Sequence, residues 1–530
     1  MRSERAHFFR QSILPVLVLD HSTRAALFVL AALILGALLL AFVSLTNAIL
    51  FSAALILAAA LLLYPESAVY LLVFAVPFGS LLPLPVGNAN VTAADVLLLG
   101  SWLLYLARGV ARRELALRTP PLVLPFVIFI LAAAVSITVA RELTDSLSEW
   151  FKWIEMLAAY WLVANFLDER RGARLLAVMF VAGLSEALLG AYQYYFRVGP
   201  EGFLLFGGAN LRAFGTFEQP NPYAGYLGLV IPLAFGAALG ILRMGLGRER
   251  SPQRSDDGEN AMANRVRNET AFVPSTAGRN ATAGGNATAF VPYWLLASGS
   301  VAAMLAALFF SYSRGAWIGV AAALGVTALF TLVRSKRAAA VGLVLLLGAL
   351  IVLGWGQINA VPDVIVQRFA TVGDYFSFED VRGVRANDEN FALVERRAHW
   401  QAALGMFEDA PWLGVGFGNY AAAYPKYALP KWDDPLGHAH NYYLNVLAET
   451  GILGFGAFVI LWGAIFWNAW RGLRAARGWT IGVAAGICGM LVALSIHNFF
   501  DNLFVHALYI QVGLSLGLGT VLPGADERAE

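Results

Sequence analysis

Two histidines near the end of a long polar stretch could carry out acid–base chemistry. His438 and His440 lie where the chain passes from polar residues into an apolar run. Unperturbed imidazole titrates near about pH 6.5, so His440 suits a general base that works near neutral pH. Because Asp433 and Asp434 are nearby, a metal site is a second interpretation, and a structural histidine at the start of a helix is a third.

Two arginines are candidates for binding an anion. Arg314 lies in a tight connection, 311–315, between two strongly apolar stretches. An arginine inside a membrane costs about 2.5–3.5 kcal/mol on insertion scales, so it either snorkels to the interface or binds an anion in a cavity. Arg212 lies between a glycine-rich run and a proline-rich turn at 220–222. It is either an ordinary loop arginine or a phosphate ligand, since a guanidinium can bind phosphoryl oxygens through two parallel hydrogen bonds.

The composition places these residues in an all-α polytopic membrane protein. Of the 530 residues, 59% are hydrophobic and 14% are charged, against roughly 25% charged residues in soluble domains. Runs of about 20 apolar residues predict about fourteen transmembrane helices, within a range of about 12–14. The predicted spans are 25–45, 48–64, 68–84, 94–107, 122–140, 151–167, 173–196, 223–243, 292–310, 315–333, 338–357, 441–470, 479–497 and 499–521. The net charge of +2 gives no sign of nucleic-acid binding.

The distribution of arginine and lysine orients these spans. Connections rich in these residues alternate with connections poor in them, as the positive-inside rule requires when both termini are cytoplasmic. Arg212, Arg314, His440 and the turn at 497–501 then all fall on the outer side of the membrane. The basic start of the chain, with apolar residues 13–19, predicts a short membrane-surface segment rather than a cleaved signal peptide.

Three parts of the chain follow from this topology. Residues 1–358 hold about eleven spans and a polar insertion, 244–291, that is predicted to be disordered. Residues 359–440 form one large periplasmic or extracellular loop, and 441–530 hold the C-terminal spans. Within the loop, 394–407 predict an amphipathic helix on the outer membrane surface. Tyr420 and Trp432 are expected to be exposed, either for stacking on sugar rings or for anchoring at the membrane interface.

Four stretches together resemble the O-antigen ligase and polymerase (Wzy-type) superfamily. They are GTFEQPNPYAGY, SRGAWIG, RRAHWQAALGMFEDAPWLGVGFGNY and HAHNYYLNVLAETGILG. The resemblance implies a GT-C-type glycosyltransferase of the bacterial inner membrane, which moves a glycan from undecaprenyl diphosphate to an acceptor hydroxyl on the outer face. The transfer would be inverting and would need no metal or cofactor. An O-antigen ligase of lipopolysaccharide biosynthesis is the nearest match, and a polysaccharide polymerase or a protein O-oligosaccharyltransferase is the alternative.

The resemblance also assigns roles to individual residues. It implies that His440 acts on the acceptor, which is a lipid, a glycan or a protein, and that Arg212 and Arg314 hold the diphosphate. Arg396 and Arg397 match a further loop arginine. We expect supporting roles for five residues: His438, Asn441, Tyr420, Trp432 and His497. Because diphosphate is a good leaving group, one base and positive charge on the phosphate oxygens suffice for this chemistry.

A polysaccharide or lipid transporter is the alternative from another functional class. Such a protein would show charged or broken helices near the middle of the membrane and two related halves. The sequence shows neither of these features, and the candidate charges gather at one membrane interface. The sequence therefore favours an enzyme.

Overall fold

The computed structural model describes residues 63–81, 84–86, 89–205, 210–248, 291–333, 380–385 and 390–522, with residues 47, 60, 61 and 208. The chain divides into two units, Met1–Ser67 and Ala68–Glu530. All the elements below belong to the second unit, except the first two residues of α3. The predicted spans at 25–45, 48–64 and 338–357 lie wholly or largely outside the described residues. So do the surface segment at 13–19 and almost all of the insertion at 244–291.

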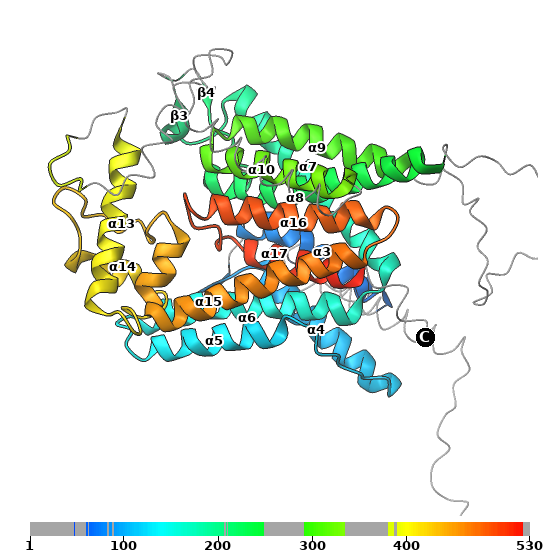
Figure 1. Cartoon of the computed structure of the whole chain (residues 1–530), viewed down its shortest axis with the longest axis horizontal. Helices are drawn as coiled ribbons and strands as arrows, with labels where there is room; N and C mark the ends of the chain where they lie inside the picture. Colours follow the sequence, from blue (N-terminus) through cyan, green and yellow to red (C-terminus); the bar gives the residue numbers. More distant parts are fainter. Residues whose placement is uncertain are drawn as a thin grey trace, which may run out of the picture. The chain divides into compact units, whose positions relative to one another are not determined.

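Helices make up most of the described chain (Figure 1), which confirms the predicted all-α class. They are α3 (Glu66–Phe78), α4 (Ala93–Arg112), α5 (Val123–Ile137), α6 (Leu143–Phe166), α7 (Glu169–Phe196), α8 (Pro220–Arg248), α9 (Val291–Phe310), α10 (Arg314–Leu332), α13 (Phe391–Asp409), α14 (Tyr420–Ala423), α15 (Tyr442–Ala475), α16 (Thr480–His497) and α17 (Leu508–Val521). Two short antiparallel hairpins accompany them, β1 (Leu84–Val86) with β2 (Ala89–Val91) and β3 (Leu204–Leu205) with β4 (Asn210–Leu211).

Seven of the described helices are long and apolar enough to cross a membrane, which supports a multi-pass membrane protein. They are α4, α7, α8, α9, α10, α15 and α16, and the apolar helices α3, α5 and α17 are shorter. Every predicted span with described residues throughout overlaps one of the helices, although α5, α6 and α17 are not among the seven candidate spans. The total of about fourteen spans remains a prediction.

Three helices that are distant in sequence, α8, α10 and α16, pack along one another (Figure 1). Glycine makes their approach close. A Cβ atom at Gly236 of α8 would clash with the backbone of Gly482 in α16, and one at Gly319 of α10 would lie 2.9 Å from the carbonyl oxygen of Ala493. Small residues of this kind let helix backbones touch, as is common between membrane helices. The contact fixes the positions of the helix ends that carry the candidate site.

Helix α15 is interrupted at Gly451, whose φ of 61° is non-helical. The loop before α14 packs into this break. The Ile452 N–H donates to the Pro411 carbonyl at 2.8 Å, and the Val415 N–H donates to the Ala448 carbonyl at 3.0 Å. The break therefore holds the loop through backbone groups that an unbroken helix would not expose.

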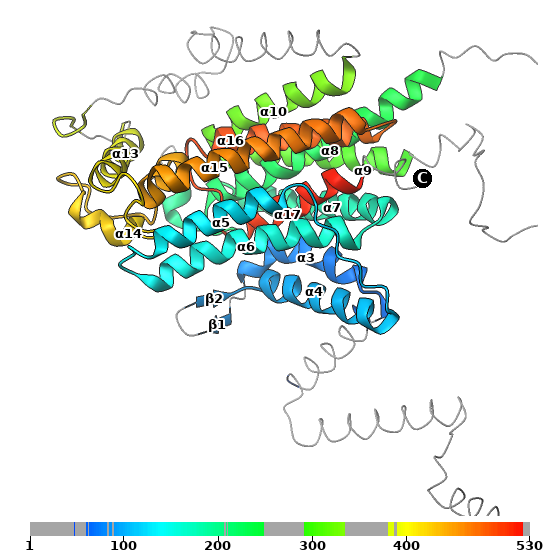
Figure 2. The same cartoon turned by 60° about the horizontal axis from the view of Figure 1, so that its bottom comes forward.

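The helix predicted at 394–407 is present as α13, and its apolar face packs on protein, whereas its place at the membrane surface stays a prediction. Figure 2 shows α13 and α14 beside the start of α15, and α13 packs against α15. Trp400 is buried against Phe499, and Met406 packs in a cluster with Tyr420. Tyr420 is therefore buried rather than exposed. The apolar residues of α13 therefore pack on protein. A period of 3.6 residues predicts an apolar helix face, but it is equally compatible with contact to lipid and contact to protein.

The last predicted span, 499–521, begins nine residues later than expected, since α17 starts at Leu508. Polar side chains hold the preceding residues in a turn. Asn498 Oδ1 accepts the Leu503 N–H at 3.1 Å, and Asn502 Oδ1 accepts the Phe504 N–H at 2.9 Å. Such local hydrogen bonds compete with helix formation. The turn carries Asp501, which the site requires.

Candidate functional site

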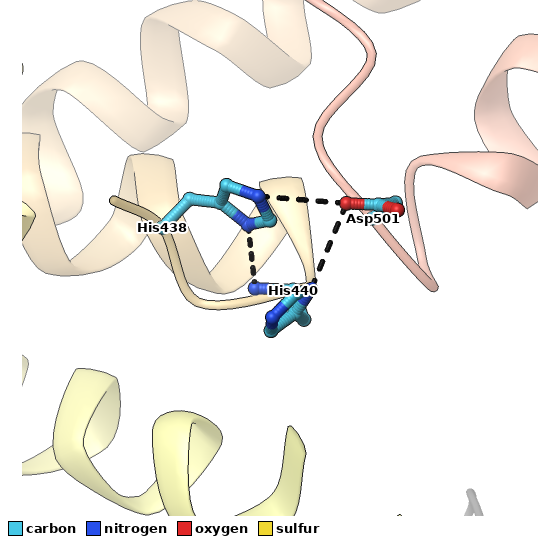
Figure 3. A group of neighbouring side chains, drawn as sticks. All are labelled: His438, His440 and Asp501. Carbon is cyan, nitrogen blue, oxygen red and sulfur yellow. Dashed lines mark hydrogen bonds and ion pairs between the residues drawn. The ribbon is translucent and has the colours of Figure 1, made fainter. Parts of the chain in front are cut away.

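The two candidate histidines face an aspartate from the far end of the chain (Figure 3). Asp501 Oδ1 lies 3.7 Å from His440 Nδ1 and 3.6 Å from His438 Nε2. The Asp501 side chain is only 9% exposed, and both histidines are mostly buried. The cluster therefore combines two imidazoles and a carboxylate in a site with little water.

Backbone contacts bring the two segments together. The Tyr442 N–H, at the start of α15, donates to the Asn498 carbonyl at 2.8 Å. Asn441 is the N-cap of α15, and its side chain accepts the second and third N–H groups of the helix at 3.1 and 3.2 Å. Asn445 Oδ1 accepts the Ala439 N–H at 3.1 Å. The chain is thus fixed on both sides of His440, and Asn441 has a capping role.

His440 has a left-handed backbone conformation, with φ of 51°. This conformation costs roughly 1–2 kcal/mol for a residue other than glycine, so neighbouring contacts must hold it. One such contact is a hydrogen bond from the His440 backbone N–H to His438 Nδ1, at 3.0 Å (Figure 3). The preceding histidine therefore helps to set the direction of the His440 side chain.

The same hydrogen bond tests the metal interpretation. His438 Nδ1 is an acceptor, so neutral His438 carries its proton on Nε2, the nitrogen that faces Asp501. A metal ion at Nε2 would need that lone pair and would move the proton to Nδ1, against the His440 N–H. Although the ligand atoms of His438, His440 and Asp501 lie within 4.8 Å of one another, these residues fit a hydrogen-bonded cluster better than a metal site.

Arg212 reaches the cluster through Asn221. Its Nη2 donates to Asn221 Oδ1 at 3.2 Å, and Asn221 Nδ2 donates to Asp501 Oδ2 at 2.5 Å. Arg212 Nε donates to the carbonyl of Ser311, in the hairpin between α9 and α10, at 2.9 Å. The guanidinium is therefore oriented by groups from two other segments.

Arg314 is the first residue of α10 and is half-buried in the same region. The residues on either side of it contact the α16 end of the cluster. Ser313 Oγ lies 3.4 Å from His497 Nε2, and a Cβ atom at Gly315 would lie 3.0 Å from the Phe500 side chain. The structure thus brings the segments of Arg212, Arg314 and His440 to one end of the helices.

Helix α13 supplies another side of the site. Buried His399 presents its ring edge-on to His440, with centroids 5.7 Å apart, and stacks on Tyr424 at 4.7 Å. Glu395, one turn earlier, acts electrostatically on His440, and Arg396 acts on Asp501 and His438. Glu395 is half-buried.

Of the two predicted loop arginines, Arg396 acts electrostatically on Asp501 and His438. Arg397 is the next residue of α13 and is also half-buried.

Burial and charge set the protonation of the cluster. Burial opposes ionisation of Asp501, but the close imidazole of His440 and the charges of His438 and Arg396 outweigh it, so the pKa of Asp501 lies well below its usual range. Burial lowers the pKa of His438 to about 4, although Asp501 acts in the opposite direction. Burial, with the charge of His440, lowers the pKa of His399 to about 3. At neutral pH the site holds an ionised Asp501 and neutral His438 and His399.

The remaining expected residues divide into two groups. Tyr420 and His497 contact the site: the Tyr420 hydroxyl donates to the His399 carbonyl at 3.1 Å, and His497 lies against Ser313. Trp432 lies behind it, because its carbonyl accepts the Tyr424 hydroxyl at 2.8 Å and its ring packs on Phe391. The structure thus gives Trp432 a packing role.

Four residues of the cluster were not among the expected site residues: Asn221, Glu395, His399 and Asp501. Asp501 had one sequence signal, because a carboxylate at the edge of an apolar run is costly unless it is paired. The pairing with Asn221 joins residues 280 positions apart. No local pattern could have revealed it.

Residues 299–459 match the family model described as O-Antigen ligase. This match confirms the superfamily resemblance. The matched stretch contains Arg314, Arg396, His438 and His440, whereas Arg212 lies before it and Asp501 after it. No curated protein matches the chain.

Proposed function

We propose that this multi-pass membrane protein, whose residues 299–459 form an O-antigen ligase domain, transfers a glycan from undecaprenyl diphosphate to an acceptor hydroxyl. The transfer takes place on the outer face of the bacterial cytoplasmic membrane. The observation that carries the proposal is the chain of contacts from Arg212 through Asn221 and Asp501 to His440. It joins the proposed phosphate ligand, Arg212, to the proposed base, His440.

His440 is the general base of the proposed reaction. With its Nδ1–H directed at Asp501, the lone pair of Nε2 is available to the acceptor hydroxyl. Asp501 orients the imidazole and stabilises the imidazolium that forms, as the carboxylate does in serine hydrolases. The 3.7 Å separation from Asp501 is longer than a hydrogen bond, and catalytic contacts of this kind tighten when substrate binds.

The bond changes follow from these roles. The acceptor oxygen attacks the anomeric carbon of the donor sugar from the face opposite the diphosphate, which inverts the configuration. Its proton passes to His440 Nε2, and the bond from the anomeric carbon to the phosphate oxygen breaks. Undecaprenyl diphosphate leaves with the electron pair.

Arginines stabilise the leaving group. Arg212, Arg314 and Arg396 provide positive charge for the diphosphate oxygens, and the hydrogen bonds of Arg212 to Ser311 and Asn221 hold it in place before the donor binds. Charge that is oriented in advance in a dry site stabilises developing negative charge far more than charge in water does. The chain's own cations therefore supply what a metal ion would otherwise provide.

A transfer assay tests the proposal directly. The full-length protein in nanodiscs is given undecaprenyl-diphosphate glycan with lipid A–core, an oligosaccharide or a serine peptide as acceptor. We expect transfer by the wild type and a loss of about 10²-fold or more for His440→Ala. Full transfer by that variant would refute the assignment of the base.

His506→Asn is the matched control. His506 also has a left-handed backbone, with φ of 48°, and asparagine tolerates that conformation. We expect this variant to transfer normally. The size of the product separates the subclasses, since one added block indicates a ligase and a ladder of products indicates a polymerase.

A further inference from the structure

His438 makes two contacts that the proposed reaction does not use. Its Nδ1 accepts the His440 backbone N–H at 3.0 Å, and its Nε2 lies 3.6 Å from Asp501 Oδ1. The His438 and His440 rings are 4.5 Å apart at 74° (Figure 3). Because each ring nitrogen of His438 already faces a partner, this residue is not a second base.

The first contact concerns the backbone of the base. His440 is held at a positive φ, which residues other than glycine rarely adopt. The imidazole of His438 satisfies the N–H of this strained residue from two positions earlier in the chain. Without that acceptor, the next turn of α15 and the Asn441 cap would still form, but His440 would lose the bond that fixes its direction.

The second contact concerns the carboxylate. Asp501 Oδ1 is shared by the Nε2 of His438 and the Nδ1 of His440, while Asp501 Oδ2 accepts from Asn221. His438 therefore directs an N–H at the same oxygen that His440 needs. An additional donor holds the carboxylate in place and withdraws part of its negative charge.

We propose that His438 is a positioning residue that fixes His440 through its backbone N–H and Asp501 through the opposite ring nitrogen. Both contacts require one neutral tautomer, with the proton on Nε2. The kinetic consequence of this proposal rests on the proposed role of His440 as base. The assignment of the His438 tautomer does not depend on that role.

The surroundings of His438 keep it neutral. The charged and titratable groups that act on it are Asp501, His440, Arg396 of α13 and Lys152 of α6. Burial disfavours the charged form of the His438 imidazole, and of these groups only Asp501 favours that form, so the pKa of His438 falls to about 4. In an assay near neutral pH, Nδ1 therefore stays an acceptor.

Two amide substitutions separate the two contacts. In His438→Asn, the side-chain oxygen can take the place of Nδ1 and accept the His440 N–H, but nothing reaches Asp501. In His438→Gln, the longer amide can reach Asp501, but the acceptor for the backbone is lost. His438→Ala removes both contacts and provides the lower limit of kcat for the comparison.

We expect His438→Asn to keep kcat within about threefold of the wild type. The acid limb of its pH–rate profile should move to higher pH. Without the N–H of His438, Asp501 keeps more negative charge and stabilises protonated His440 more strongly. We expect His438→Gln to lose about tenfold or more in kcat with the acid limb unmoved. Equal or reversed losses for these two variants, or wild-type kinetics for His438→Ala, would overturn the proposal.

Solid-state NMR of the full chain, with ¹⁵N-labelled histidine, tests the tautomer without any substrate. The signal that disappears in His438→Asn identifies the residue, and thermal unfolding in detergent confirms that the variant is folded. We expect an unprotonated Nδ1 and a protonated Nε2 between about pH 6 and pH 8. The other tautomer would refute the assignment. Absence of transfer by the wild type would instead refute the proposed function, and the spectrum would still decide the role of His438.

Discussion

Asn221 and Asp501, 280 positions apart in the chain, share a hydrogen bond of 2.5 Å. The first lies in the first turn of α8 and the second follows α16, so the bond joins the ends of two helices whose backbones touch. Asn221 also accepts from Arg212, and Asp501 also faces His440. The Asn221 amide and the Asp501 carboxylate therefore connect the candidate phosphate ligand, Arg212, to the candidate base, His440.

Replacing this amide by a carboxylate should be worse than removing it. We expect Asn221→Asp to lose about 10²-fold in kcat and Asn221→Ala about tenfold, because two carboxylates so close together cannot both be ionised. Donor-saturated transfer kinetics measure the difference. If Asn221→Asp were as active as the wild type, Asn221 and Asp501 would not be coupled in the working enzyme.

Asp501→Asn should lower kcat much more than it changes the KM for donor or acceptor. The substitution keeps the shape of the side chain but removes the charge that orients and stabilises His440, an effect that reaches about 10⁴-fold in serine proteases. We expect a loss of about 10²-fold or more in transfer. A rise in KM with unchanged kcat would indicate that Asp501 binds substrate instead.

The neighbouring arginines of α13 provide a matched pair. Arg396 acts electrostatically on Asp501 and His438, and Arg397 is the next residue of the same helix. We expect Arg396→Ala to raise the donor KM about tenfold and Arg397→Ala to raise it by much less. The comparison needs both variants at one ionic strength, and a larger effect at Arg397 would reverse the assignment.

Stability should fall as the pH decreases below about 6.5. Burial holds the pKa of His399 at about 3 and that of His438 at about 4, while both would take up a proton near about pH 6.5 in the unfolded chain. The unfolded state therefore binds more protons in this window, which lowers the free energy of unfolding by about 2 kcal/mol per histidine at about pH 5.

The low pKa of Asp501 has a dependence of the same sign but at lower pH, because its contribution to stability is complete above about pH 3.9 and is lost only in stronger acid. Asp501 therefore does not add to the histidine effect near pH 5. Thermal unfolding at several pH values measures the slope, and His399→Phe should reduce it. An unchanged slope in that variant would show that His399 is already charged in the folded protein.

Two glycines of α15 should respond differently to alanine. At Gly451 the φ of 61° is unfavourable for alanine, and a Cβ atom would clash with the backbone of Trp412. We expect Gly451→Ala to destabilise the protein by about 1–3 kcal/mol. Gly456 lies in the same helix with nothing within 4 Å of a Cβ atom, so Gly456→Ala should be neutral or stabilising by up to about 1 kcal/mol. Thermal unfolding of the two variants provides the comparison.

The sequence predicted the helices better than it predicted their partners. Hydrophobic length located the described spans, and residue chemistry singled out Arg212, Arg314 and His440, because an arginine or a histidine at the edge of an apolar run needs a physical reason. The same reasoning could not find Asn221 or His399, since their roles depend on segments far away in the chain. It also missed the protein partner of α13, because an apolar stripe is equally suited to a lipid surface and to a protein surface.

The backbone contact of α8, α10 and α16 has a mechanical consequence. Asn221, the hairpin that anchors Arg212, and Asp501 are attached to the ends of these three helices, which cannot slide past one another where glycine leaves no clearance. They therefore behave as one stiff frame. His440 is tied to this frame from the start of α15, where the Tyr442 N–H donates to the Asn498 carbonyl. The groups on the leaving-group side are thus held in position by helix packing before any substrate binds.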